Sequence, residues 1–131
     1  MTFAKHAGVF TLAALLSTSV AIVSANAQST APYYEGKTVE IYVGFSPGGG
    51  YDTYARILAE HLPRHIPGNP VMVVKNMPGG GSRTAAGYMA NIAPDDGTAI
   101  ATTDQSLPLF QVLGDDTITY DMAAFNYIGN P

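Results

Sequence analysis

The chain has 131 residues, with 6 lysines and arginines against 10 aspartates and glutamates, a formal net charge of −4 and no cysteine. The low number of basic residues argues against a nucleic-acid-binding protein, because such a surface needs clustered lysine and arginine. Without cysteine the chain has no disulfide or thiolate chemistry, so its fold must depend on a hydrophobic core.

Residues 1–27 have the pattern of a secretory signal peptide. Lys5 supplies the positive start, residues 9–23 are mostly apolar, and Ala25-Asn26-Ala27 is a small-x-small cleavage site. A membrane-spanning helix would need roughly 20 apolar residues, and this run is shorter and interrupted by Ser17, Thr18 and Ser19. We therefore expect cleavage after Ala27, export, and a mature chain of residues 28–131 that forms one domain.

After an exposed leader that ends near Lys37, strand and helix patterns alternate along the mature chain. Strands are expected at residues 38–44, 70–75 and 98–102, and helices from Asp52 to about Pro63 and from 82 to 92. This order predicts an α/β fold with a mostly parallel sheet flanked by helices. The first strand is almost entirely apolar, which is typical of a strand buried on both faces.

Four local expectations follow from the residue types. Asp52 is expected to be the N-cap of the first helix. The inward face of that helix is expected to hold the residues at helical spacing, which are Tyr54, Ile57, Leu58, His61 and Leu62. A short helix is expected at residues 107–113, and residues 125–129 have the composition of a further strand that is just beginning.

Two glycine-rich loops, at residues 47–52 and 78–82, each lead from a strand end into a helix start. A helix start exposes N–H groups without intrahelical partners, and glycine lets the backbone approach a ligand closely. Two such loops at neighbouring strand ends predict an anion cradle made of backbone, and we expect it to bind a carboxylate. The end of the third strand is a weaker candidate. The candidate binding residues are Pro47, Gly48, Gly49, Gly50, Tyr51, Asp52, Pro78, Gly79, Gly80, Gly81, Ser82, Thr103 and Ser106.

Other interpretations of these residues are weaker. Gly44-Phe45-Ser46-Pro47-Gly48 matches the nucleophile elbow of serine hydrolases, but that site uses the N–H of the residue after the serine, and proline has none. Neither loop has the lysine and hydroxyl residue of a phosphate-binding loop. His61 and His65 have a zinc-like spacing but no evident third ligand. The glycine loops are also compatible with plain tight turns, and Arg83 with either a carboxylate partner or a solvated side chain.

The two loops resemble the signatures of the Bug/TctC family, the extracytoplasmic solute receptors of tripartite tricarboxylate transporters. The resemblance is carried by residues 42–52 with Ala55-Arg56, by residues 73–82, by residues 93–98 and by Tyr120-Asp121. It implies a periplasmic protein of the type II periplasmic-binding-protein fold, with a ligand cleft between two lobes. It also implies a small organic carboxylate as ligand, transporter subunits as partners, and no metal, cofactor or enzymatic activity. We expect a monomer.

Two features depart from the family pattern. The family usually has threonine or serine before the aspartate, where this chain has Tyr51, so a phenol is expected to narrow the pocket or to stack on the ligand. Family members are also more than twice as long. Residues 28–131 are therefore expected to be the N-terminal lobe, or part of it, with the second lobe absent. A carboxylate receptor, a hydrolase using Ser46 and an inactive fragment all remain possible at this stage.

Overall fold

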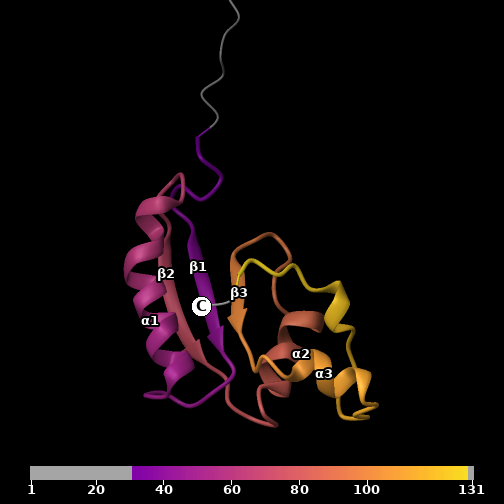
Figure 1. The fold of residues 1–131 in the computed structure, drawn as a ribbon. Coiled ribbons are helices and arrows are strands. Elements are labelled where there is room, and N and C mark those ends of the chain that lie inside the picture. Colours follow the sequence, from indigo (N-terminus) through magenta and orange to yellow (C-terminus); the bar gives the residue numbers. More distant parts are fainter. Residues whose placement is uncertain (1–30, 130–131) are drawn as a thin grey trace, which may run out of the picture.

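A computed structural model describes residues 31–129 (Figure 1). The predicted signal peptide and its cleavage site after Ala27 lie outside these residues. The elements within them, in chain order, are β1 (Thr38–Val43), α1 (Gly50–His61), η1 (Leu62–His65), β2 (Val71–Asn76), α2 (Arg83–Asn91), β3 (Ala99–Thr102), α3 (Leu107–Val112) and η2 (Met122–Ala124).

The three strands form one parallel sheet in the order β2-β1-β3, which confirms the predicted α/β fold. Thr38 to Val43 of β1 pair with Val71 to Asn76 of β2, and Glu40 to Val43 pair with Ala99 to Thr102 of β3. Because all strands run the same way, their carboxyl ends meet at one edge of the sheet. Both glycine loops begin at that edge, as the sequence predicted.

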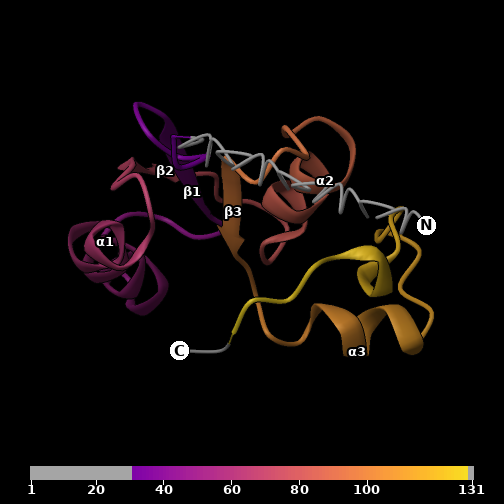
Figure 2. The same cartoon turned by 90° about the horizontal axis from the view of Figure 1, so that it is seen from above.

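The two longer helices cover opposite faces of the sheet (Figures 1 and 2). Ile41 and Val43 of β1 pack against Ala55 of α1 in one buried cluster. On the other face, Tyr42 packs against Tyr88 of α2, with ring centroids 4.7 Å apart. Alternate residues of β1 therefore pack against different helices, which explains why the sequence of this strand is almost continuously apolar.

The predicted inward face of α1 is wrong. Asp52 and Ala55 are the buried residues of this helix, whereas Tyr54, Ile57 and Leu58 are 56%, 48% and 41% exposed. The small Ala55 side chain lets the helix lie close to β1. The helix is also turned so that Asp52 reaches Asn76 at the end of β2. Large apolar side chains are consequently left on the flanks of the helix.

The C-terminal part of the described chain packs on α2 rather than extending the sheet. Leu107 of α3 is fully buried. It packs in a second hydrophobic cluster that also contains Ala86, Ile118, Tyr120 and Met122. The short helix expected at residues 107–113 is confirmed as α3. The strand expected from Phe125 is not formed within the described residues, where η2 is followed by irregular chain.

The helices within residues 31–129 are all too short or too polar to cross a bilayer.

Candidate functional site

The first glycine loop delivers the start of α1 to the carboxyl edge of the sheet. Gly48 has φ +87°, a conformation that favours glycine, and Gly49 is the N-cap residue without any side-chain cap. The first bond into the helix runs from the Thr53 N–H to the Gly49 carbonyl, at 2.9 Å. Within the described residues, the N–H groups of residues 49–52 donate to no protein acceptor, which leaves the helix start open to an anion.

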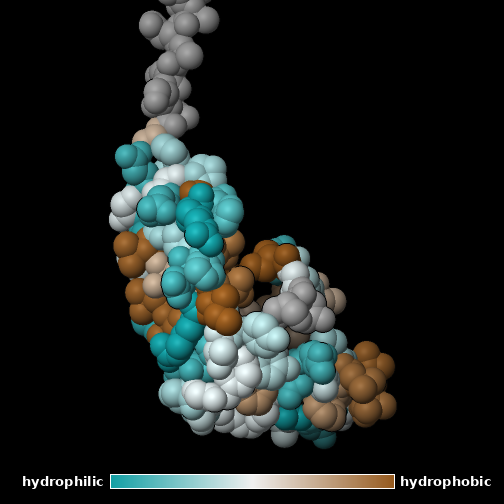
Figure 3. All heavy atoms as spheres, turned by 60° about the vertical axis from the view of Figure 1, so that its left-hand side comes forward, coloured by the Kyte–Doolittle hydropathy of each residue, from teal (hydrophilic) through white to brown (hydrophobic). Residues whose placement is uncertain are grey.

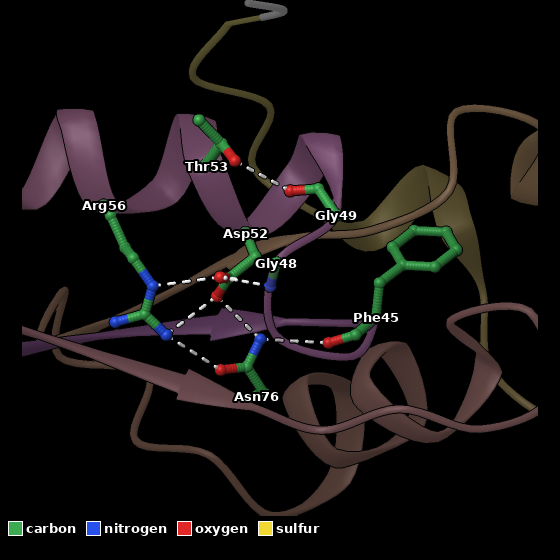
Figure 4. Close-up of polar contacts among 7 residues, drawn as sticks. All are labelled: Phe45, Gly48, Gly49, Asp52, Thr53, Arg56 and Asn76. Atoms are coloured by element: carbon green, nitrogen blue, oxygen red, sulfur yellow. Dashed lines mark hydrogen bonds and ion pairs between the residues drawn. The ribbon is translucent and has the colours of Figure 1, made fainter.

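Asp52 is not the N-cap that the sequence predicted. It lies in the first turn of α1, 3% exposed, and its carboxylate accepts from the Gly48 N–H at 2.8 Å (Figure 4). Arg56 donates to it from Nε and Nη2, both at 2.9 Å, and Asn76 Nδ2 donates at 2.8 Å. Hydrogen bonds from these three groups hold the pKa of the Asp52 carboxyl well below its usual range, and the Arg56 guanidinium has the largest effect.

The Asp52 carboxylate is engaged by donors of the protein itself. Its charge is matched by Arg56, and its two oxygens are occupied by protein donors. Asn76 extends this network, because its Nδ2 also donates to the Phe45 carbonyl at 3.0 Å (Figure 4). The end of β2 therefore fixes the first loop at two points. The Asp52–Arg56 pair was detectable in the sequence from its i,i+4 spacing, but the role of Asn76 was not.

The second glycine loop takes an unusual left-handed course. Gly79, Gly80, Gly81 and Ser82 have φ values of +137°, +53°, +59° and +69°. The loop closes with the Arg83 and Thr84 N–H groups donating to the carbonyls of Gly80 and Gly79. Among the described residues, no protein acceptor is bound by the N–H groups of residues 79–82. This loop thus also presents free backbone donors at the start of a helix.

Ser82 joins the two loops. It is fully buried, and its Oγ donates to the Gly44 carbonyl at 3.3 Å. A Cβ added to Gly44 would lie 2.2 Å from that Oγ, so the loops approach as closely as they do only because residue 44 is glycine. Ser82 is a candidate binding residue, but it is fully buried and its hydroxyl contacts protein.

Substituting Gly44 with alanine is expected to destabilise the protein by about 1–3 kcal/mol, because the new methyl group overlaps Ser82. In a domain of this size the melting temperature (Tm) falls by roughly 4–8 °C for each kcal/mol. Thermal unfolding measures the loss. The matched control is Gly50→Ala, where an added Cβ meets no atom within 4 Å.

Adding Ser82→Gly to Gly44→Ala should restore part of the lost Tm, since it removes the overlapping atoms and suits the φ of +69° at residue 82. Equal Tm values for Gly44→Ala and the wild type would contradict the close approach of the loops.

The Arg83 side chain holds the second loop through contacts with three other residues. Its Nη1 donates to the Gly80 carbonyl at 2.7 Å, its Nη2 pairs with Asp115, and its guanidinium lies 5.1 Å from the centre of the Phe110 ring. Hydrogen bonds from the Thr117 hydroxyl and from Arg83 lower the pKa of Asp115 to about 2. Arg83 thus pairs with a carboxylate of the protein, and its pairing with a ligand carboxylate stays a prediction.

Tyr51 stacks on Phe45, with ring centroids 4.4 Å apart and planes 14° from parallel. Its ring packs against the cluster of Ile41, Val43 and Ala55. The phenol expected to narrow the pocket or to stack on a ligand is therefore stacked on a neighbour from the same loop. The N–H of this residue remains available for a ligand.

The end of the third strand offers fewer groups to a ligand than the two glycine loops do. Thr102 pairs with Val43, so the end of β3 lies beside the end of β1. Thr103 and Ser106, the two candidate residues here, are half-buried. The Ser106 N–H donates to the Asp104 carboxylate at 2.8 Å and is not free. This strand end can offer hydroxyl groups to a ligand but not the open helix start that the glycine loops offer.

The competing sites receive no support from the described residues. Ser46 is exposed in the first loop, and within residues 31–129 it makes no hydrogen bond with a histidine. His61 and His65 lie at the opposite end of α1 from the glycine loop. In the same part of the chain, no three His, Asp or Glu side chains gather as a metal site would need.

Comparison with known proteins gives one informative similarity. The chain is 29% identical over 129 residues to the "UPF0065 protein in gbd 5'region" of Cupriavidus necator. The match covers 98% of this chain and 37% of the relative, so the chain spans little more than a third of the relative's length. No protein-family model matches the chain. No solved structure matches it either. UPF0065 is a designation of the Bug/TctC family, so this similarity supports the resemblance seen in the glycine loops.

Proposed function

We propose that the chain is the N-terminal part of a Bug/TctC-type extracytoplasmic solute receptor that binds a small organic carboxylate in the periplasm for a tripartite tricarboxylate transporter. Two observations support this proposal. One is the similarity to the UPF0065 protein over almost the whole chain. The other is the pair of glycine loops that end in helix starts at one edge of a parallel sheet.

The observation that carries the carboxylate proposal is the set of unoccupied backbone donors. In the described chain, the N–H groups of residues 49–52 and 79–82 bind no protein acceptor. The basic side chains nearest to them, Arg56 and Arg83, are each engaged by an aspartate. An anion would therefore be held by backbone N–H groups and by the positive ends of α1 and α2. Such donors favour a carboxylate oxygen over a neutral hydroxyl.

Recognition of this kind does not depend on long-range attraction, because the chain has a net charge of −4. It depends on short-range hydrogen bonds, each contributing about 1.5–3 kcal/mol when the acceptor is charged. The described residues form one wall of the proposed site, so on their own they are expected to bind weakly, with a Kd of about 1 mM.

A thermal-shift series tests the proposal. The full chain is exported with its own leader, purified, and melted with small mono-, di- and tricarboxylates, with sugars and nucleotides as controls. A ligand that binds only the folded state raises Tm as its concentration passes Kd. We expect a rise with one class of carboxylate and none with sugars. Cooperative melting that no carboxylate shifts would overturn the proposal.

Export itself gives a further prediction. Intact-mass measurement of the exported protein should show the loss of residues 1–27, because Ala25 and Ala27 satisfy the small-residue rule of signal peptidase. Ala27→Phe should block this processing, whereas the matched variant Ala27→Ser should not. A purified protein that keeps Met1 to Ala27 would contradict the assignment of a signal peptide.

A further inference from the structure

The peptide group between Gly80 and Gly81 lies in the middle of the second glycine loop, and its orientation determines what the loop presents to a ligand. Its carbonyl and its N–H point in opposite directions, because the described residues contain no cis peptide bond. Both glycines are exposed and have positive φ. Glycine adopts many backbone conformations at little cost, so the two glycines alone do not determine which way this peptide group points.

Arg83 holds this peptide group by its carbonyl. The Arg83 Nη1 donates to the Gly80 oxygen at 2.7 Å, and the Arg83 backbone N–H donates to the same oxygen at 3.3 Å. The carbonyl therefore points toward Arg83, and the Gly81 N–H points away from it. A reversed peptide group would leave both donors without this acceptor and would place an oxygen where the loop now offers an N–H.

Asp115 holds the Arg83 side chain in the position from which it reaches Gly80. One oxygen of its carboxylate, Oδ2, pairs with Arg83 Nη2. The other oxygen, Oδ1, accepts from the Thr117 N–H at 2.9 Å and from the Thr117 hydroxyl. A guanidinium suits this arrangement, because Nη1 can donate to Gly80 while Nη2 donates to Asp115. The Asp115 carboxylate is thus fixed within its own turn and directs one oxygen at Arg83.

The turn that carries Asp115 follows α3 and is anchored in the second hydrophobic cluster. The Asp115 N–H donates to the Phe110 carbonyl at 3.0 Å, and the Ile118 N–H donates to the Asp115 carbonyl at 3.1 Å. Leu107 and Ile118 are buried in the cluster. Elsewhere α3 is open, and Figure 3 shows hydrophobic surface at the end of the molecule where α3 lies in Figure 1. The pair of Asp115 with Arg83 is therefore one of the contacts that join this part of the chain to α2.

We propose that Asp115 is a positioning residue of the carboxylate site: it holds Arg83, Arg83 holds the Gly80 carbonyl, and the Gly81 N–H is thereby kept facing the ligand. The inference rests on the proposed function and adds to it a residue outside both glycine loops, 32 residues from Arg83. In this role neither Asp115 nor the Arg83 guanidinium binds the ligand. Direct pairing of Arg83 with the ligand would give Asp115 the opposite effect, because Asp115 would then compete with the ligand.

The test compares Asp115→Asn with Asp116→Asn, the same chemical change at an exposed neighbour that makes no side-chain hydrogen bond within the described residues. Each full chain is exported, labelled with ¹⁵N and titrated with succinate and with citrate, below its Tm, while amide chemical shifts are followed by NMR. We expect Asp115→Asn to weaken binding by about tenfold or more, the effect of losing one hydrogen bond to a charged acceptor. Asp116→Asn should keep the wild-type Kd within about threefold.

The spectra without ligand test the positioning step by itself. Once Arg83 is released, the peptide group between Gly80 and Gly81 should sample both orientations. Asp115→Asn should therefore shift or broaden the Gly81 amide signal and leave that of Gly48, in the first loop, unchanged.

Arg83→Lys separates the ion pair from the hold on Gly80. Lysine keeps a positive charge beside Asp115, but its single ammonium group cannot reproduce the two-armed contact of the guanidinium. We expect this variant to weaken carboxylate binding to the same extent as Asp115→Asn. Because Asp115 acts through Arg83, adding Asp115→Asn to Arg83→Lys should cause no further loss of affinity.

Equal affinities of the wild type and Asp115→Asn would overturn the positioning role and leave the proposed function standing. Tighter binding by Asp115→Asn would also overturn it, in favour of direct pairing between Arg83 and the ligand. If Asp115→Asn does not fold, wild-type affinity in Arg83→Lys has the same consequence. Absence of binding by the wild type would instead count against the proposed function. The positioning role is then decided without ligand, and an unchanged Gly81 amide signal in Asp115→Asn would overturn it.

Discussion

Asp52→Asn is expected to lower Tm by at least about 5 °C, the largest stability loss from a single atom change in the first loop. The asparagine side chain keeps one acceptor oxygen. The other oxygen becomes an NH2 group, which is itself a donor and faces donors of the protein. Gly48, Arg56 and Asn76 all donate to the native carboxylate, so at least one of them would lose its acceptor. The Arg56 charge would also lose its partner.

Thermal unfolding at pH 7 measures this effect. The matched control is Asp116→Asn, the same chemical change at an exposed position that makes no side-chain hydrogen bond within the described residues. Surface changes of this kind usually alter stability by less than about 0.5 kcal/mol. Equal Tm values for the two variants would contradict the role given to Asp52.

The same carboxylate makes stability depend on pH, with a defined sign. The folded-state pKa of Asp52 is lowered by Arg56, Gly48 and Asn76, so the folded protein releases this proton more readily than the unfolded chain. Its contribution is complete above the unfolded pKa of about 3.9 and is lost as pH falls below that value toward the folded pKa. Asp115, with a pKa of about 2, acts in the same direction. The stability of the wild type should therefore fall more steeply than that of Asp52→Asn below about pH 4.

Gly50→Pro is expected to weaken carboxylate binding by about tenfold or more without unfolding the protein. Gly50 is the first residue of α1, the position where proline is best tolerated in a helix. Gly49 has φ −82° and ψ 174°, an extended conformation that suits the residue before proline. The substitution therefore deletes one free N–H and leaves the helix intact. Losing one hydrogen bond to a charged acceptor costs about 1.5–3 kcal/mol, which sets the expected loss of affinity.

Gly50→Ala is the matched control, because it adds a side chain of similar position and keeps the N–H. Isothermal titration with the carboxylate that gives the largest thermal shift compares the two variants. If backbone N–H groups hold the ligand, alanine retains the wild-type affinity within about threefold and proline does not. Equal affinities for the alanine and proline variants would exclude this N–H from the site.

The arrangement of strands and helices was predictable because each element can be identified from a pattern of neighbouring residues. The apolar run of β1, the glycine loops after β1 and β2, and the turn before β3 each identify an element from its own residues. The alternation of these elements then implies a parallel sheet, and the carboxyl edge where the candidate residues gather follows from its geometry. The resemblance to a receptor family came from the same loops.

The features that escaped prediction depend on residues far apart in the chain. Periodicity favoured the large side chains of α1 as its inward face, but the helix turns Ala55 toward β1 because Asp52 binds Asn76, which is 24 residues away. The contact of Ser82 with Gly44 and the pairing of Arg83 with Asp115 span 38 and 32 residues. No local pattern specifies such partners. They decide which polar groups near the loops are already engaged and which remain free.

The proposal that backbone N–H groups hold a carboxylate is tested most directly by observing those groups. The exported protein, labelled with ¹⁵N, is titrated with a carboxylate while amide chemical shifts are followed by NMR. We expect saturable shifts at residues 49–52 and 79–82, with Gly68 and Asn69, outside both glycine loops, unchanged. Saturable shifts elsewhere with both loops unaffected, or no shifts at millimolar carboxylate, would contradict the proposed site.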